Sequence, residues 1–229
     1  MSPVRIIQAM ARKRLIQSPP AQGSVLQFTE ICKPCSEKRP AKYCLGWKTV
    51  IPEQHPLRLG QFLDKKTPLH IELSAQLDYR RDGSANVDEW QADPLRSANI
   101  TIKVVPEGGG HDGSVRYHLD LANAGQEGSI WHLQVGGKGD KLVRLDLPRW
   151  GSGPMDVTLA LDTIIYNYRY SAWVDLQRDG MYRRTIMESE DLIMRAWYAK
   201  IAGHFSLPAE KRSGSILALV DNMSEATSQ

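Results

Sequence analysis

Hydrophobic and polar residues alternate through the middle of the chain, which is the pattern of half-buried β-strands. In segment 70–80 every second side chain is apolar or aromatic: Ile71, Leu73, Ala75, Leu77 and Tyr79. The same period of two recurs in four later segments: 99–105, 115–121, 130–135 and 142–147. Because polar turns separate these segments, we expect an antiparallel β-meander of at least five strands with one covered face.

Helical periodicity follows the predicted strands, with apolar residues three or four positions apart. Ser152 or Gly153 can cap a first helix, which would have Pro154 at its first position. The sequence RDG at 178–180 contains a glycine and should end this helix.

A second C-terminal helix and an N-terminal helix are also predicted. Thr185 and Glu188 have the spacing of a capping box, and the apolar stripe that follows runs to about His204. Residues 4–15 have the apolar spacing of a short basic amphipathic helix. Since the strands precede the C-terminal helices instead of alternating with them, we expect an α+β fold with these helices packed on one face of the sheet.

The composition is that of an ordinary globular protein. The chain has 229 residues, of which 41% are hydrophobic and 24% charged, and these values exclude collagen-like, coiled-coil and wholly disordered chains. No apolar run is long enough to span a bilayer, so no membrane partner is expected.

The net charge of +3 is unevenly distributed. Residues 1–57 contain nine Lys or Arg and three Asp or Glu, whereas residues 58–229 contain 20 and 23. We therefore divide the chain into a basic N-terminal segment (1–57), an α+β domain (58–221) and a flexible tail (222–229). The basic segment favours an anionic partner, nucleic acid above all. The residues expected to make this contact are Arg12, Lys13, Arg14, Lys38, Arg39, Lys42 and Tyr43.

All three cysteines lie in the basic segment, with the spacing Cys32-x2-Cys35-x8-Cys44. Together with His55 they could hold a zinc ion in a Cys₃His site. The alternative is three reduced cysteines in a basic loop, because a strong zinc signature has a second close pair of ligands. An odd and clustered cysteine count does not fit a secreted disulfide framework, so we expect a cytoplasmic protein.

A polar row is predicted on the uncovered face of the sheet. If residues 122–128 turn the chain symmetrically, His118 lies opposite His132, and the next hairpin places His132 opposite Arg144. With Asp120 nearby, these imidazoles could act as an acid–base pair or share a metal. The alternative is a solvated sheet face with no chemistry. Arg149 and Trp150, at the junction between strands and helices, could form a further binding pair or merely pack.

Two functions are consistent with these features. The first is a non-catalytic binding component, such as a subunit of a nucleic-acid-associated assembly with protein partners, which uses the basic segment. The alternative is a hydrolase of the phosphoester type with its site at His118, His132 and Asp120. The charge asymmetry is counted directly, whereas the histidine row depends on an assumed register, so we favour the binding component.

Overall fold

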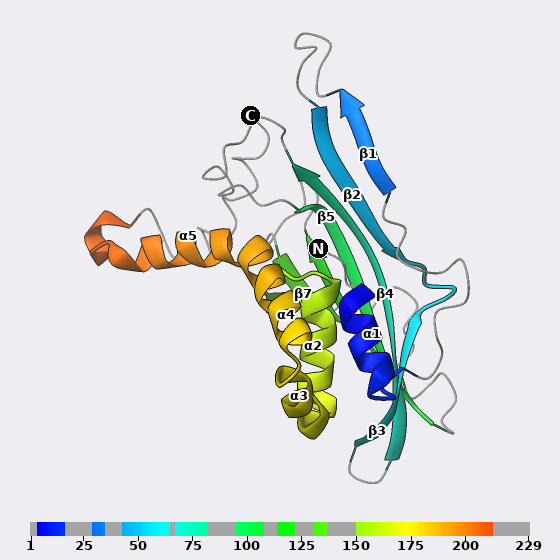
Figure 1. Cartoon of the computed structure of the whole chain (residues 1–229). Coiled ribbons are helices and arrows are strands. Elements are labelled where there is room, and N and C mark those ends of the chain that lie inside the picture. The colour runs from blue at the N-terminus through cyan, green and yellow to red at the C-terminus, as the bar shows by residue number, and fades with distance from the viewer. Residues whose placement is uncertain are drawn as a thin grey trace.

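The computed structural model describes most of the chain (Figure 1). The described residues are 4–16, 29–34, 43–64, 67–81, 95–107, 114–121, 131–136 and 150–212. Within them, one antiparallel sheet of eight strands is covered on one face by helices, which confirms the predicted α+β class.

The sheet has the strand order β1-β2-β4-β5-β6-β7-β8, and β3 pairs with β4. The strands are β1 (Thr29–Pro34), β2 (Tyr43–Ile51), β3 (Leu57–Asp64), β4 (Thr67–Arg81), β5 (Leu95–Pro106), β6 (Val115–Leu121), β7 (Trp131–Val135) and β8 (Trp150–Gly151). The predicted strands at 70–80, 99–105, 115–121 and 130–135 correspond to β4, β5, β6 and β7. The predicted strand at 142–147 lies outside the described residues.

Strands β2 and β3 follow one another along the same edge of β4. Ile51 at the end of β2 pairs with Ala75, and Leu57 at the start of β3 pairs with Leu73. The five residues between them form a short excursion in an otherwise continuous edge. The predicted domain boundary after residue 57 therefore falls at the start of β3, and the sheet runs across it.

The helices form a layer on the apolar face of the sheet (Figure 1). They are α1 (Val4–Arg12), α2 (Val157–Tyr168), α3 (Tyr170–Gln177), α4 (Gly180–Ile193) and α5 (Arg195–Ser206), followed by the 3₁₀ helix η3 (Ala209–Lys211). Helix α1 packs beside α4 although the two are far apart in sequence, and α5 extends away from the layer.

The core lies between the helical layer and the face of the sheet formed by the alternating residues of β4. Leu73 and Leu77 are fully buried there, as are Ile6 and Met10 of α1. The aromatic rings of Phe62 in β3 and Tyr168 in α2 lie 6.0 Å apart and join the sheet to the helices. The N-terminal segment thus contributes to the same core as the C-terminal helices.

Three features of the predicted helices are wrong, and the first is the position of both ends of the first helix. The first helix begins at Val157 because Asp156, and neither Ser152 nor Gly153, accepts the capping hydrogen bond, from the Leu159 amide at 2.9 Å. It ends at Tyr168, since Arg169 leaves helical geometry with φ −146° and ψ 57°.

The capping box is the second error. Thr185 lies inside α4, where its hydroxyl donates to the Met181 carbonyl at 2.8 Å. Asp179 caps the helix instead, accepting from the amides of Met181 and Tyr182. The third error is the length of this helix, because Met194 separates α4 from α5. The predicted interruption at 178–180 is confirmed.

Candidate anion-binding surface

Helix α1 presents its basic residues to solvent because its apolar stripe faces the core. Ile6, Ala9 and Met10 are buried, whereas Arg5 and Arg12, seven residues apart, share an exposed flank of the helix. The apolar stripe therefore fixes which way the cations of α1 point.

The end of α1 is a Schellman turn with an arginine where glycine is usual. The amide of Arg14 donates to the Ala11 carbonyl at 2.9 Å, and the amide of Leu15 donates to the Met10 carbonyl at 3.0 Å. Arg14 has a left-handed backbone with φ 56°. Leu15 and Met10 are both buried and supply the hydrophobic contact of this motif. The turn leaves Lys13 and Arg14 exposed at the end of the helix.

Helix α4 and the turn before it add further cations beside α1. Arg12 forms an ion pair of 3.2 Å with Asp179, which links the end of α1 to the start of α4. Arg183 and Arg184 of α4 are exposed, as is Arg178 in the preceding turn. We name these seven cations the basic surface: Arg5, Arg12, Lys13, Arg14, Arg178, Arg183 and Arg184.

Three carboxylates only partly balance the basic surface. Asp179 pairs with Arg12, Asp175 with Arg178 at 3.2 Å, and Glu188 with Arg184 at 2.9 Å. Within the described residues, no carboxylate pairs with the other four cations, which are Arg5, Lys13, Arg14 and Arg183. Because seven cations face three carboxylates, the surface has an excess of positive charge that is available to an anion. The three exposed ion pairs themselves contribute little stability.

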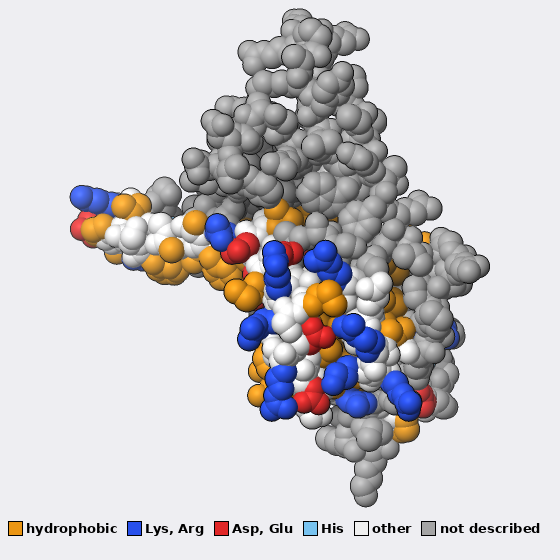
Figure 2. Space-filling view, viewed as in Figure 1, with side chains coloured by type: hydrophobic (Ala, Val, Ile, Leu, Met, Phe, Trp, Pro, Cys, Tyr) orange, Lys and Arg blue, Asp and Glu red, His pale blue; other side chains and the backbone are white. Residues whose placement is uncertain are grey.

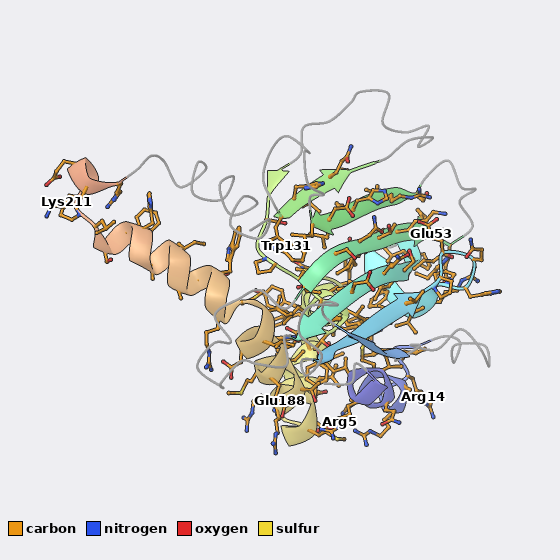
Figure 3. All side chains as sticks on the ribbon, turned by 90° about the horizontal axis from the view of Figure 1, so that it is seen from above. Arg5, Arg14, Glu53, Trp131, Glu188 and Lys211 are labelled. Atoms are coloured by element: carbon orange, nitrogen blue, oxygen red, sulfur yellow. The ribbon has the colours of Figure 1, made fainter. Side chains whose placement is uncertain are left out.

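The figures show the extent of this surface. In the space-filling view, Lys and Arg side chains gather over α1 and α4, with few acidic side chains among them (Figure 2). Seen from above, Arg5, Arg14 and Glu188 lie on the outer side of the helical layer, away from the sheet (Figure 3). The potential of such a face would attract anions and steer their approach.

The structure divides the predicted binding residues into three groups. Arg12, Lys13 and Arg14 are brought together in the basic surface. Tyr43 is in β2 opposite Pro34, and Trp150 is in β8 opposite Leu133, so both belong to the sheet. The remaining predicted residues lie outside the described part of the chain: Lys38, Arg39, Lys42, Arg144 and Arg149.

The predicted zinc ligands are only partly placed. Cys32 is in β1 opposite Leu45, Cys44 is in β2 opposite Lys33, and Cys35 lies outside the described residues. His55 follows the far end of β2, which at about 3.3 Å per residue is more than 20 Å along the strand from Cys44. The described backbone does not bring His55 to Cys44. Among the described residues, no group of three His, Cys, Asp or Glu could hold a metal ion. The zinc site stays a prediction.

The predicted histidine row lies on the expected face of the sheet, but the pairing of β6 with β7 differs from the expected one. His118 pairs with Gln134 and Asp120 pairs with His132, so the register differs by two residues from the expected one. The reason is the length of the connection, since nine residues instead of seven separate the paired residues Leu121 and Trp131. A shift by an even number keeps His118, Asp120 and His132 on the predicted face.

The predicted neighbour of His132 on the next strand is also wrong. Gly151 of β8, and not Arg144, pairs with His132. The imidazole Nε2 lies 3.8 Å from Asp120 Oδ2, and Asn99 Nδ2 donates to Asp120 Oδ1 at 2.7 Å. His118 instead forms a hydrogen bond of 3.1 Å between its Nδ1 and Thr101 Oγ1.

The pair of Asp120 and His132 resembles the pairs in which a carboxylate orients an imidazole for general base catalysis. However, His132 is only 2% exposed. An imidazole at this depth cannot contact a substrate in solution without movement of the groups that cover it. The burial therefore favours a role in stability.

Four residues of the basic surface were missed by reasoning from the sequence: Arg5, Arg178, Arg183 and Arg184. Arg5 shares a helical face with Arg12 and was detectable from its spacing of seven residues. Arg183 lies in the acidic part of the sequence, and only the packing of α1 against α4 brings it to the basic segment.

Comparisons with protein-family models, with curated proteins and with solved structures find no match. Among the described helices, none has the length and apolar character needed to cross a membrane. The function must therefore be inferred from the site itself.

Proposed function

We propose that the protein is a non-catalytic binding component of a nucleic-acid-associated assembly and that the basic surface contacts phosphate groups. The observation that carries this proposal is the exposed group of four cations without a carboxylate partner among the described residues: Arg5, Lys13, Arg14 and Arg183. Arginine and lysine on an exposed helical face are the groups that neutralise nucleic-acid phosphates. The clustered cysteines favour a reducing compartment, and we place this function in the cytoplasm.

The backbone of Arg14 gives independent support. A left-handed conformation costs a residue with a side chain about 1–2 kcal/mol, and glycine avoids this cost. An arginine at this position is therefore unfavourable for the turn alone. The strain is consistent with a role of the guanidinium at the protein surface, because strained positions are often functional.

Arg14→Gly separates the two roles of this residue. We expect the variant to gain about 0.5–1 kcal/mol in free energy of unfolding, because relief of the left-handed strain exceeds the added chain entropy of glycine. Binding of a short nucleic acid should weaken, and the slope of log K against log salt should fall in magnitude by about 0.7–0.9. Urea unfolding and fluorescence anisotropy between about 50 and 200 mM salt measure these quantities.

Two control variants complete the experiment. Arg14→Lys keeps the charge and should bind like the wild type. Lys211→Ala removes a cation from η3, beyond the far end of α5 and distant from Arg14, and should leave the salt slope unchanged (Figure 3). If the wild type shows no affinity for DNA or RNA at low salt, the proposal is wrong.

The hydrolase is the second candidate, and the Asp120–His132 pair is the observation in its favour. Catalysis would require His132 to become accessible, since a general base must reach the group from which it takes a proton. Its burial makes this candidate the weaker one.

His132→Ala tests this candidate directly. We expect the variant to lose about 1–3 kcal/mol in free energy of unfolding, because it removes a buried polar ring and the group that faces Asp120. Thermal unfolding monitored by circular dichroism would show a lower midpoint. A phosphodiesterase or phosphomonoesterase activity that the wild type has and a fully folded His132→Ala lacks would favour the hydrolase instead.

A further inference from the structure

Three aromatic rings form a cluster where α2 meets α3. Tyr166 lies edge-on to Tyr170 and to Trp173, with ring centroids 5.7 and 5.1 Å away and interplanar angles of 79° and 78°. Tyr170 stacks on Trp173 at 5.7 Å and 21°. Tyr166 is 49% exposed and Tyr170 is 60% exposed, so the outer rings of the cluster are open to solvent.

Hydrogen bonds to Asp162 hold the inner ring of this cluster in place. Trp173 Nε1 donates to Asp162 Oδ1 at 2.8 Å. The same oxygen accepts from the hydroxyl of Tyr182, a residue that is 1% exposed, at 2.9 Å. Trp173 is thereby fixed, and Tyr170 rests on it. A ring that is already ordered loses little entropy when a planar ligand stacks on it.

The aromatic cluster and the cations at the end of α1 lie at the same end of the helical layer. The end of α1 meets β3, where the Gly60 amide donates to the Leu15 carbonyl at 3.1 Å. The end of α2 meets the same strand through the ring contact of Tyr168 with Phe62. The ends of α1 and α2 thus contact residues of β3 that are two positions apart. Tyr170 lies two residues after the end of α2 and begins α3.

We propose, resting on the function proposed above, that the nucleic acid is single-stranded and that one of its unpaired bases stacks on Tyr170. Phosphates would lie on Arg12, Lys13 and Arg14 at the end of α1, so the charge of the surface complements the ligand. Proteins that bind single strands combine a positive surface with aromatic rings on which bases stack. In a duplex the bases are paired and stacked on one another, so their faces cannot reach an exposed tyrosine.

The experiment compares Tyr170→Ala with two matched variants. Affinity is measured by fluorescence anisotropy with labelled oligothymidylate, oligouridylate and a hairpin duplex. Tyr170→Ala should weaken binding of both single strands about ten-fold and leave duplex binding unchanged, since stacking on one ring is lost. Tyr170→Phe keeps the ring and should bind like the wild type. Tyr198→Ala removes an equally exposed tyrosine from α5, outside the cluster, and should have no effect.

The outcomes separate this inference from the proposed function. If the wild type binds no oligonucleotide at low salt, both are wrong. If the wild type binds but Tyr170→Ala binds single strands as tightly as before, only the stacking inference is wrong. An equal loss of single-strand and duplex affinity in Tyr170→Ala would also overturn it, because the residue would then not distinguish the two ligands.

Discussion

Replacing Asp156 by alanine is expected to lower the free energy of unfolding by roughly 2–4 kcal/mol. Asp156 accepts a hydrogen bond from the Leu159 amide at the start of α2 and another from the Ser189 hydroxyl of α4. Loss of the cap costs about 0.5–2 kcal/mol, and a buried hydroxyl without an acceptor costs about 1–3 kcal/mol. Ser189 is fully buried, so water cannot replace the lost acceptor.

Urea unfolding of the wild type, Asp156→Ala and Asp156→Asn measures this effect. Asparagine is a good N-cap, and its amide can still bond to the Ser189 hydroxyl, so Asp156→Asn should keep most of the stability. An alanine variant as stable as the wild type would show that the two hydrogen bonds do not hold α2 against α4.

The same asparagine variant tests the ionisation of Asp156. Burial raises the pKa of this carboxyl above its ordinary value of 3.8, although the hydrogen bonds from Ser189 and the α2 amides oppose the shift. The folded protein therefore holds the proton more tightly than the unfolded chain, and stability due to this group falls as the pH rises through and above 3.8. Asparagine does not ionise. The free energy of unfolding of Asp156→Asn, relative to that of the wild type, should therefore increase as the pH rises from about 4 to 7. A difference that stays constant over this range would contradict the raised pKa.

Replacing Asp162 by alanine is the second change with a large expected effect. Its Oδ1 accepts hydrogen bonds from Trp173 of α3, from Gln177 of α3 at 3.3 Å and from Tyr182 of α4. The hydroxyl of Tyr182, a residue that is 1% exposed, would lose its acceptor, at a cost of about 1–3 kcal/mol. Release of the Trp173 indole and the Gln177 amide adds to this cost, and we expect a total of roughly 2–4 kcal/mol.

Matched variants distinguish the parts of this network. Asp162→Asn retains an acceptor oxygen and should lose less than half as much stability as Asp162→Ala. Tyr182→Phe removes one hydrogen bond and leaves the ring, so we expect a loss of about 0.5–1.5 kcal/mol. Chemical unfolding of the three variants measures these differences. If Tyr182→Phe cost as much as Asp162→Ala, the network would depend on that single bond and the indole would contribute nothing.

The sheet was the most predictable part of the fold. In β4, the alternation of Leu73, Ala75 and Leu77 with polar residues reflects one buried face, and this constraint is present in the sequence itself. Register is a weaker signal because it depends on the length of each connection. The connection between β6 and β7 is two residues longer than predicted, and His132 therefore pairs with Asp120 instead of His118.

Helix ends were harder to predict because several residues compete for each cap. Pro154 favours a helix that begins at Pro154 itself. Asp156 makes the capping hydrogen bond instead, and the helix begins at Val157. Thr185 and Glu188 have the right spacing for a capping box, yet their segment is inside α4. Local spacing does not reveal that the helix is capped by Asp179, six residues before Thr185.

Only part of the candidate site could be found from the sequence. Arg12, Lys13 and Arg14 are adjacent, so their shared surface follows from their order. The contribution of Arg183 depends on a tertiary contact between α1 and α4, and the proposed joint use of Tyr170 and the cations of α1 rests on the contacts of α1 and α2 with β3. A single sequence contains no signal for contacts of this kind.

The packing of α1 against α4 also bears on how the chain is made. Arg12 and Asp179, which form an ion pair across this contact, are separated by 167 residues. At a synthesis rate of about 5–20 residues per second, roughly 10–30 s pass between the appearance of α1 and that of α4. During this interval the apolar face of α1, with Ile6 and Met10, has no α4 to cover it. The contact of α1 with α4 can therefore form only after residues 180–193 have been translated.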